Sequence, residues 1–263
     1  MVRNPFSKRP LVPIIRLEGI IGATARLGGS AINDSLLAQP IERAFKGKPA
    51  AVALQINSPG GSPVQSALIA ARIRRLADEK GVKVYAFCED VAASGGYWLA
   101  TAADEIYVDP ASIIGSIGVI SAGFGLNEFI ARHGIERRVY TAGEDKSMLD
   151  PFRPERERDV MRLKEIQTDL HQVFIAQVKA RRGDKLAEAD LFTGDVWLGG
   201  QAVELGLVDG TAHLVPKMKE LFGDKTRFSV TKPRRGLLSR FGMSAPDLVG
   251  AIEDRAAWAR YGV

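Results

Sequence analysis

Short apolar runs alternate with amphipathic stretches along the first half of the chain. Three runs of β-branched and apolar residues, at 13–21, 51–56 and 82–88, predict strands, and a fourth run at 105–108 predicts a shorter one. Between the second and third runs, apolar residues recur at three- and four-residue steps over positions 63–79, which predicts a helix. This alternation predicts an α/β fold in which a mostly parallel sheet is flanked by helices.

The remaining periodic segments predict further helices. One candidate covers 32–41, a helix of small residues covers about 94–103, and a short helix covers 127–133. A long helix follows Pro154, with apolar residues at three- and four-residue steps and a charged opposite face. We expect this helix to end at Gly183, because glycine commonly follows the last turn of a helix.

The 263 residues are enough to bury a sizeable core, and they contain no internal repeat and no long linker. We therefore expect a single domain over 1–263, with an amphipathic and basic C-terminal extension from about residue 232. The net charge of +5 is small and lies mostly in the last forty residues. No nucleic-acid-binding module accompanies it, so we expect no nucleic-acid partner. Contact of the extension with acidic lipid is an alternative to the favoured interpretation, a solvated surface.

Composition also argues against a metal site, a disulfide bond and a membrane-spanning segment. Cys88 is the only cysteine, and His133, His171 and His213 show no metal-ligand spacing, so we expect no metal and no cofactor. The first residues lack the apolar stretch of a signal peptide. The least polar window, 113–126, is short and interrupted by glycines, which favours a buried strand and a glycine loop. We expect a cytoplasmic protein, at most peripheral to the inner membrane.

Two glycine-rich turns follow the buried strand runs, where parallel sheets form their sites. In the second turn, Ser94 begins a predicted helix and precedes Gly95 and Gly96. A serine there gains from the positive end of the helix dipole, and the two glycines allow a substrate backbone to approach. Ser94 is therefore a candidate nucleophile, although serine is also a favoured N-cap residue.

The first turn, Asn57-Ser58-Pro59-Gly60-Gly61, has two interpretations. Its glycines can direct a backbone N–H at a developing oxyanion. Alternatively, the turn simply leads into the helix that begins at Pro63, because proline suits a first helical position.

Lys146 is a candidate general base or an ordinary loop lysine. A lysine acts as a base only when its amine is neutral, which burial favours. Nothing in the sequence marks Lys146 as buried, and a pairing with the adjacent Asp145 would favour the charged amine.

Five short motifs, in this order, carry a family resemblance over roughly residues 12–222. The chain resembles the signal peptide peptidase A and SohB-like serine peptidases, which have a Clp-protease-like or crotonase-like fold of repeated ββα units. The matching segments are Asn57-Ser58-Pro59-Gly60-Gly61, Ala93-Ser94-Gly95-Gly96-Tyr97, Gly115-Ser116-Ile117-Gly118-Val119, Lys146-Ser147 with Asp150-Pro151-Phe152, and Gly206-Leu207-Val208-Asp209.

The resemblance implies a Ser–Lys dyad of Ser94 and Lys146, with Gly61 as the oxyanion contact and Ser116 as the residue that orients the lysine. It also implies that Gly60, Gly95 and Gly96 contact substrate. The expected substrates are extended peptides, unfolded protein, or membrane-protein and signal-peptide fragments. Homo-oligomeric rings are expected, in which neighbouring subunits can complete a site. The chain departs from membrane-bound members by lacking an N-terminal transmembrane segment.

Several alternatives stay open at the level of sequence. A crotonase-type acyl-thioester hydratase or isomerase could use the same fold and glycine turn, with Glu or Asp at its reacting centre. An inactive ring scaffold that binds peptides would not need Ser94 at all. A phage capsid-maturation peptidase would share the chemistry, and His133 is an alternative base.

Overall fold

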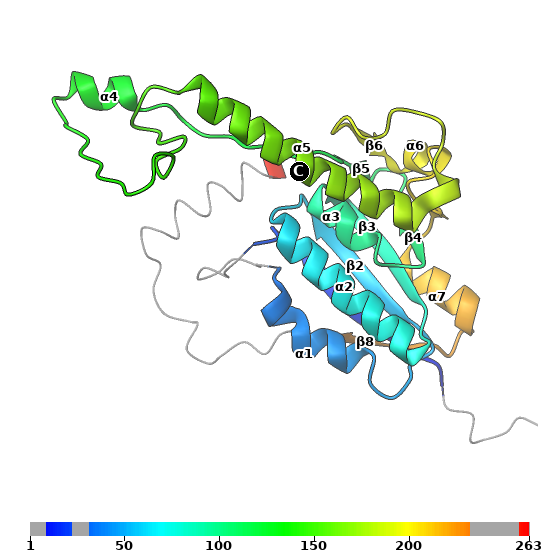
Figure 1. Cartoon of the computed structure of the whole chain (residues 1–263). Helices are drawn as coiled ribbons and strands as arrows, with labels where there is room; N and C mark the ends of the chain where they lie inside the picture. The colour runs from blue at the N-terminus through cyan, green and yellow to red at the C-terminus, as the bar shows by residue number, and fades with distance from the viewer. Residues whose placement is uncertain (1–8, 23–31, 232–257, 263) are drawn as a thin grey trace, which may run out of the picture. The chain divides into compact units, whose positions relative to one another are not determined.

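The computed structural model describes residues 9–22, 32–231 and 258–262 (Figure 1). The chain forms two compact units, a larger one that comprises the residues up to Ile117 and from Ile175 onward, and a smaller one, Gly118–Phe174. The described elements, in chain order, are β1 (Leu11–Glu18), α1 (Asp34–Ala44), β2 (Val52–Ser58), α2 (Pro63–Lys80), β3 (Val84–Ala93), α3 (Gly95–Ala100), β4 (Glu105–Val108), β5 (Ile113–Gly115), α4 (Asn127–Arg132), α5 (Glu157–Arg182), β6 (Val196–Leu198), α6 (Gly199–Glu204), β7 (Gly210–Thr211), α7 (Leu214–Phe222) and β8 (Arg227–Thr231), with a 3-10 turn at Gly183–Lys185.

The larger unit is built on one sheet, in which eight strands fall among the described residues. The strand order is β6-β5-β3-β2-β1-β8, and β4 pairs with both β3 and β7. Every pairing is parallel except that between β5 and β6. The predicted α/β fold with a mostly parallel sheet is therefore confirmed.

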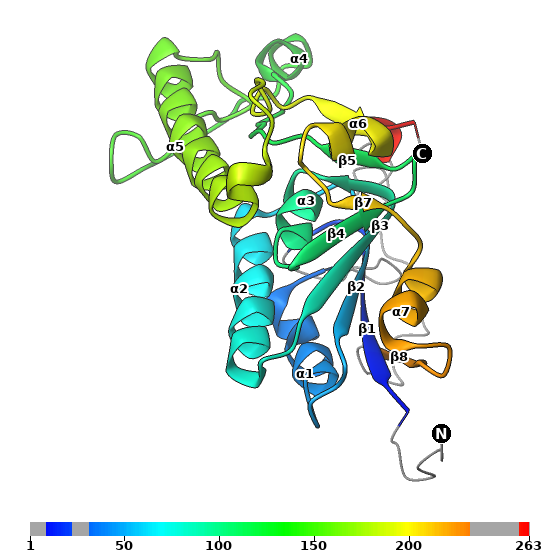
Figure 2. The ribbon, with the colours of Figure 1, turned by 90° about the vertical axis from the view of Figure 1, so that its right-hand side faces the viewer.

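Helices cover both faces of this sheet. Figure 2 shows α1, α2 and α3 on one face and α7 on the other. The face under α7 carries a cluster of apolar side chains from alternate strand positions, among them Val12, Ala53 and Phe87, which pack with Met218 of α7. The intervening positions, such as Ile15, are also fully buried, because successive side chains of a strand point to opposite faces. The strands are apolar along their length because both of their faces are covered.

Helix α2 positions the first glycine turn, and its sequence explains its limits. Ser62 accepts a hydrogen bond from the backbone N–H of Gln65, and Pro63 occupies the first turn. Gly81 ends the helix in the left-handed conformation, with φ of 61°. The helix predicted over 63–79 is thus confirmed to within one residue.

The expectation of a buried strand and a glycine loop over 113–126 is confirmed. The strand covers Ile113–Gly115, and the residues from Ile120 to the end of the window are exposed. The strand ends where Gly115 and Ser116 take positive φ values of 112° and 52°. The predicted C-terminal extension from about residue 232 lies largely outside the described residues, and the single-domain organisation stays a prediction.

The smaller unit contains α4 and most of α5. Helix α4 has no buried residue, and the unit exposes several large apolar side chains, including Ile120, Phe124 and Phe129. Throughout the described ranges of the chain, the structure contains no helix with the length and apolarity that crossing a membrane requires. The same ranges contain no cluster of three or more His, Cys, Asp or Glu side chains that could hold a metal ion.

Candidate active site

Ser94 lies at the junction of β3 and α3 in an uncommon backbone conformation. Its φ is 52° and its ψ is −122°, and its side chain makes no capping hydrogen bond to α3. The backbone N–H of Ser94 donates to the carbonyl of Gly115 at 2.8 Å, and all six residues of α3 are buried. The interpretation of Ser94 as a plain N-cap is therefore wrong. A serine with positive φ and an uncommitted hydroxyl, on a strand-to-helix turn, is typical of a nucleophile.

The two glycine-rich turns pack directly against each other. A Cβ atom added to Gly60 would lie 2.8 Å from the Cβ of Ser94, and one added to Gly96 would lie 2.4 Å from the carbonyl oxygen of Ser58. A Cβ on Gly95 would lie 2.5 Å from Ser66 Oγ. These separations are too short for any side chain, so the glycines are required for the turns to meet.

Backbone N–H groups point to where an oxyanion could bind. Gly61 is exposed, and its N–H has no hydrogen-bond partner in the part of the chain that the structure describes. Its nitrogen lies 3.4 Å from the position of a Cβ on Gly95. Gly95 is the first residue of α3, so its own N–H is also outside the helix ladder. Sequence reasoning assigned Gly95 only to substrate contact. Its place right after Ser94, at a helix start, was the available signal for a second N–H donor.

Ser116 is buried and follows Gly115, whose carbonyl accepts the hydrogen bond from the backbone N–H of Ser94. Its φ is 52°, and its backbone N–H donates to the carbonyl of Asp195 at 2.7 Å. Its hydroxyl oxygen lies 3.4 Å from the hydroxyl of Tyr261, which donates to it. Sequence reasoning missed Tyr261 because nothing in the primary sequence links the last residues to position 116.

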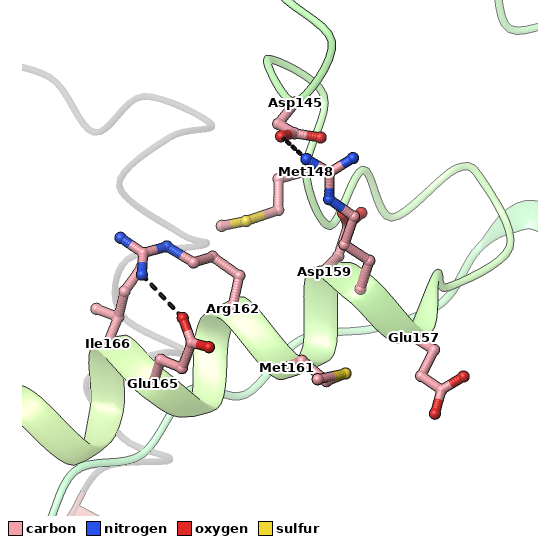
Figure 3. Close-up of a pocket in the computed structure, with 9 residues that line it drawn as sticks. Asp145, Met148, Glu157, Asp159, Met161, Arg162, Glu165 and Ile166 are labelled. Atoms are coloured by element: carbon pink, nitrogen blue, oxygen red, sulfur yellow. Dashed lines mark hydrogen bonds and ion pairs between the residues drawn. The ribbon is translucent and has the colours of Figure 1, made fainter.

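Lys146 belongs to the smaller unit and is exposed in the single chain. It lies in a turn, in which its backbone N–H donates to the carbonyl of Gly143 at 3.3 Å. Its amine has no ion pair among the described residues. The carboxylate of Asp145 is instead bound by Arg158 at 2.7 Å (Figure 3). An ion pair between Asp145 and Lys146, which would favour the charged amine, is therefore absent from the described structure.

The motif Gly206-Leu207-Val208-Asp209 holds α3 in place through a hydrogen bond. The buried hydroxyl of Tyr97, on α3, donates to the carbonyl of Leu207 at 2.7 Å. Burial opposes ionisation of Asp209, but hydrogen bonds from Arg182 and Lys185 outweigh it and lower its pKa. This motif was recognised by family resemblance alone, and its hydrogen bonds show that it has a structural role.

Cys88 is not available as a nucleophile, and His133 stays an alternative base. Cys88 is buried, and burial, assisted by the charge of Glu89, raises the pKa of its thiol to about 12. The prediction of a small core residue is confirmed. His133 is exposed, and its Nδ1 lies 2.8 Å from the carbonyl oxygen of Phe129.

Comparison with known proteins supplies both the class and the family of this chain. The model of peptidase family S49 matches residues 77–221, a segment that contains Ser94, Ser116 and Lys146. The chain belongs to peptidase family S49. By family it is a serine peptidase of the signal peptide peptidase A and SohB type, which confirms the resemblance seen in the sequence.

Individual relatives extend this similarity to nearly the whole chain. The chain is 46% identical to a protein named Na+/H+ antiporter NhaA from Brucella melitensis, over 96% of this chain and 37% of that protein. It is 29% identical to the chloroplastic serine protease SPPA of Arabidopsis thaliana, over 93% of this chain and 37% of that protein. The chain thus spans about a third of the length of these curated relatives.

A solved structure shows the same fold. The chain aligns with a membrane-bound stomatin-specific protease, a lysine-to-alanine mutant in complex with a substrate peptide, with a TM-score of 0.52 and 13% identity. The alignment covers 94% of this chain and 99% of that one.

Proposed function

We propose that the chain is a serine endopeptidase in which Ser94 is the nucleophile and Lys146 the general base. The observation that carries this proposal is the conformation of Ser94, which has positive φ and a hydroxyl free of capping bonds, beside the Gly60-Gly61 turn. Holding a non-glycine residue in this conformation costs on the order of 1–3 kcal/mol, which a plain cap would not require.

The reaction proceeds through an acyl-enzyme. The neutral amine of Lys146 takes the proton from the hydroxyl of Ser94 as Oγ attacks the peptide carbonyl carbon. The carbonyl oxygen gains negative charge and accepts a hydrogen bond from the N–H of Gly61, with Gly95 as a second donor. The protonated amine then gives its proton to the leaving nitrogen, and the C–N bond breaks. Water, deprotonated by the same amine, attacks the ester and frees Ser94.

Two further residues complete the proposed site. Ser116 orients the lysine amine through its hydroxyl, and the contact with Tyr261 fixes the rotamer of that hydroxyl. Gly60, Gly95 and Gly96 pack around Ser94, and we expect an extended peptide, the proposed form of substrate, to bind beside them. Peptides, unfolded protein and fragments of membrane or signal peptides all fit this requirement.

A homo-oligomeric ring, with a dyad completed between subunits, belongs to the same proposal. The exposed apolar side chains of the smaller unit support it, since Phe124 is 85% exposed and Ile120 67% exposed. We also place the protein in the cytoplasm with peripheral membrane contact. The name of the Brucella relative, an Na+/H+ antiporter, supports proximity to a membrane.

Covalent labelling tests this function directly. We expect a fluorophosphonate probe to label the wild-type chain once, on Ser94, and to leave Ser94→Ala and Lys146→Ala unlabelled. Ser35→Ala and Lys164→Ala are the matched controls, because both residues are exposed on helices, and both should label normally. Cleavage of an unstructured protein is followed in parallel.

The alternatives give different outcomes in the same assay. A crotonase-type enzyme would bind acyl-CoA and leave Ser94 unlabelled across alkaline pH. A peptide-binding scaffold would retain peptide binding in Ser94→Ala without any cleavage by the wild type. Either result would remove the peptidase interpretation.

A further inference from the structure

The loop that carries Lys146 is held in shape by two buried carboxylates. The side chain of Asp159, 5% exposed, accepts a hydrogen bond from the backbone N–H of Leu149 at 3.2 Å. The side chain of Asp150, 6% exposed, accepts one from the backbone N–H of Phe152 at 3.1 Å. These contacts fix the loop within the smaller unit, so the side chains on its exposed rim are not needed for its fold.

Two more carboxylates directly precede Lys146, and one guanidinium binds both. Arg158 Nη2 lies 2.7 Å from Asp145 Oδ2, and Arg158 Nη1 lies 3.4 Å from Glu144 Oε1. Arg158 belongs to α5, and a dashed line in Figure 3 marks the ion pair that Asp145 makes. The Arg158 side chain is 63% exposed, so the pair contributes little to stability.

The other basic side chains around the loop have partners of their own. Hydrogen bonding with Asp159 is the main reason that the pKa of Arg156 is raised, and the charge of Asp145 adds to it less strongly. Arg153 Nε lies 4.0 Å from Asp150 Oδ2. Arg158 is therefore the group that engages the acids next to Lys146 directly.

The binding of Asp145 and Glu144 by Arg158 affects the proposed base, Lys146. Carboxylates beside an amine favour its charged form, whereas the proposed reaction requires the neutral form. An arginine stays protonated at every working pH, so its charge offsets that of the carboxylates it binds.

We propose that Arg158 is a positioning residue of the peptidase reaction, which binds Asp145 and Glu144 and so keeps both carboxylates from Lys146. This rests on the proposed function of Lys146 as the base. The residue acts through the two acids and does not touch the substrate.

The size of the effect follows from Coulomb's law. Between charges on adjacent, exposed residues in water, one uncompensated carboxylate lowers the fraction of neutral amine by roughly threefold.

The first test measures how much of the Lys146 amine is neutral, and it does not depend on catalysis. Acetylation of Lys146 by an N-hydroxysuccinimide ester is followed by peptide mass spectrometry against pH, in the full chain carrying Ser94→Ala. We expect Arg158→Gln to slow acetylation of Lys146 about threefold at neutral pH, while the Lys164 peptide of the same sample is unchanged. Arg158→Lys keeps the charge and should restore most of the rate. Asp145→Asn added to Arg158→Gln should restore part of it.

The matched control is Arg162→Gln, on the same helix one turn later. Arg162 is 61% exposed and forms its ion pair with Glu165, at 2.9 Å, and not with Asp145 or Glu144. It should leave Lys146 acetylation at the wild-type rate. An unchanged rate in Arg158→Gln, or an equal loss in Arg162→Gln, would overturn the proposal.

The second test is the pH profile of kcat/KM in the active chain. Arg158→Gln should move the acidic limb upward by about half a unit and leave the alkaline plateau unchanged, whereas a merely structural role would lower the whole profile. A uniform loss would overturn the proposal. Full labelling of Ser94 in Lys146→Ala would instead overturn the dyad, and the acetylation result would still decide whether Arg158 shields Lys146.

Discussion

Arg182, at the end of α5, is the charged residue whose replacement should cost the most stability. Its side chain is 3% exposed, and Nη1 lies 2.7 Å from Asp209 Oδ2. Its Nε and Nη2 donate to the carbonyl of Gly206 at 3.0 and 2.8 Å. Arg182→Met keeps an unbranched apolar side chain at this position and removes all three bonds. Asp209 then keeps two partners, Lys185 and the backbone N–H of Ile106.

The magnitude follows from this accounting of partners. Removing one member of a buried ion pair costs about 3–5 kcal/mol, because the other charge stays buried. Asp209 retains two partners and its side chain is 15% exposed, which places the loss at the lower end. We expect a loss of about 3 kcal/mol. In a chain of this size that corresponds to a fall in Tm of roughly 6–12 °C.

The same contact gives a pH dependence with a defined sign. Burial raises the pKa of Asp209, but the bonds from Arg182 and Lys185 outweigh burial and lower it. A carboxyl whose pKa is lowered by folding contributes stability above its unfolded pKa, and loses it as pH falls through the folded value. The Tm difference between wild type and Arg182→Met should therefore be full at pH 7 and shrink below about pH 4.

Thermal unfolding followed by circular dichroism, from pH 7 down to pH 3, measures both quantities. Arg162→Met is the control on the same helix, because its side chain is exposed, and its Tm should stay within about 1 °C of wild type. Equal Tm values for Arg182→Met and wild type at pH 7 would refute the reasoning. A difference that persists undiminished at low pH would refute its electrostatic part.

Three further predictions concern the site and the core. Gly61→Ala should lower kcat/KM by about a hundredfold, since its Cβ would lie 2.0 Å from the carbonyl oxygen of Ile21 and displace the N–H donor. Gly22→Ala, with nothing within 4 Å of its Cβ, should retain wild-type activity. Ser94→Gly should raise the free energy of unfolding in urea by about 1 kcal/mol, because glycine tolerates positive φ, while abolishing cleavage; an unchanged urea midpoint would argue against strain at this position. Cys88, with its pKa raised by burial to about 12, should resist iodoacetamide at pH 8 and react only in urea, as mass spectrometry would show.

Much of the larger unit could be predicted because its elements obey local rules. The strand at 105–108 and the helix from Pro63 are set by apolar periodicity and by capping residues, and both formed as expected. The meeting of the two glycine turns followed from the parallel sheet, which brings the carboxyl ends of neighbouring strands to one edge.

What could not be predicted depends on contacts between residues distant in sequence. The strained φ of Ser94 is imposed by buried surroundings, which local propensity does not register. Arg182 lies in a helix with a charged face and shows no sequence sign of burial, which arises from its bonds to Gly206 and Asp209. The apolar window around Phe124 does not indicate that this side chain is 85% exposed.

The pairing of β8 with β1 bears on the order in which the chain folds. Leu11 pairs with Arg227, and the hydroxyl of Thr231 donates to the carbonyl of Ile14 at 3.0 Å. Contacts of such sequence separation form slowly, and β8 leaves the ribosome long after β1. The free edge of β1 is therefore open to other strands during synthesis. The two glycine turns around Ser94 come from an earlier, compact stretch of the chain, so they can meet before β8 arrives. Pairing of β8 then covers the open edge of β1.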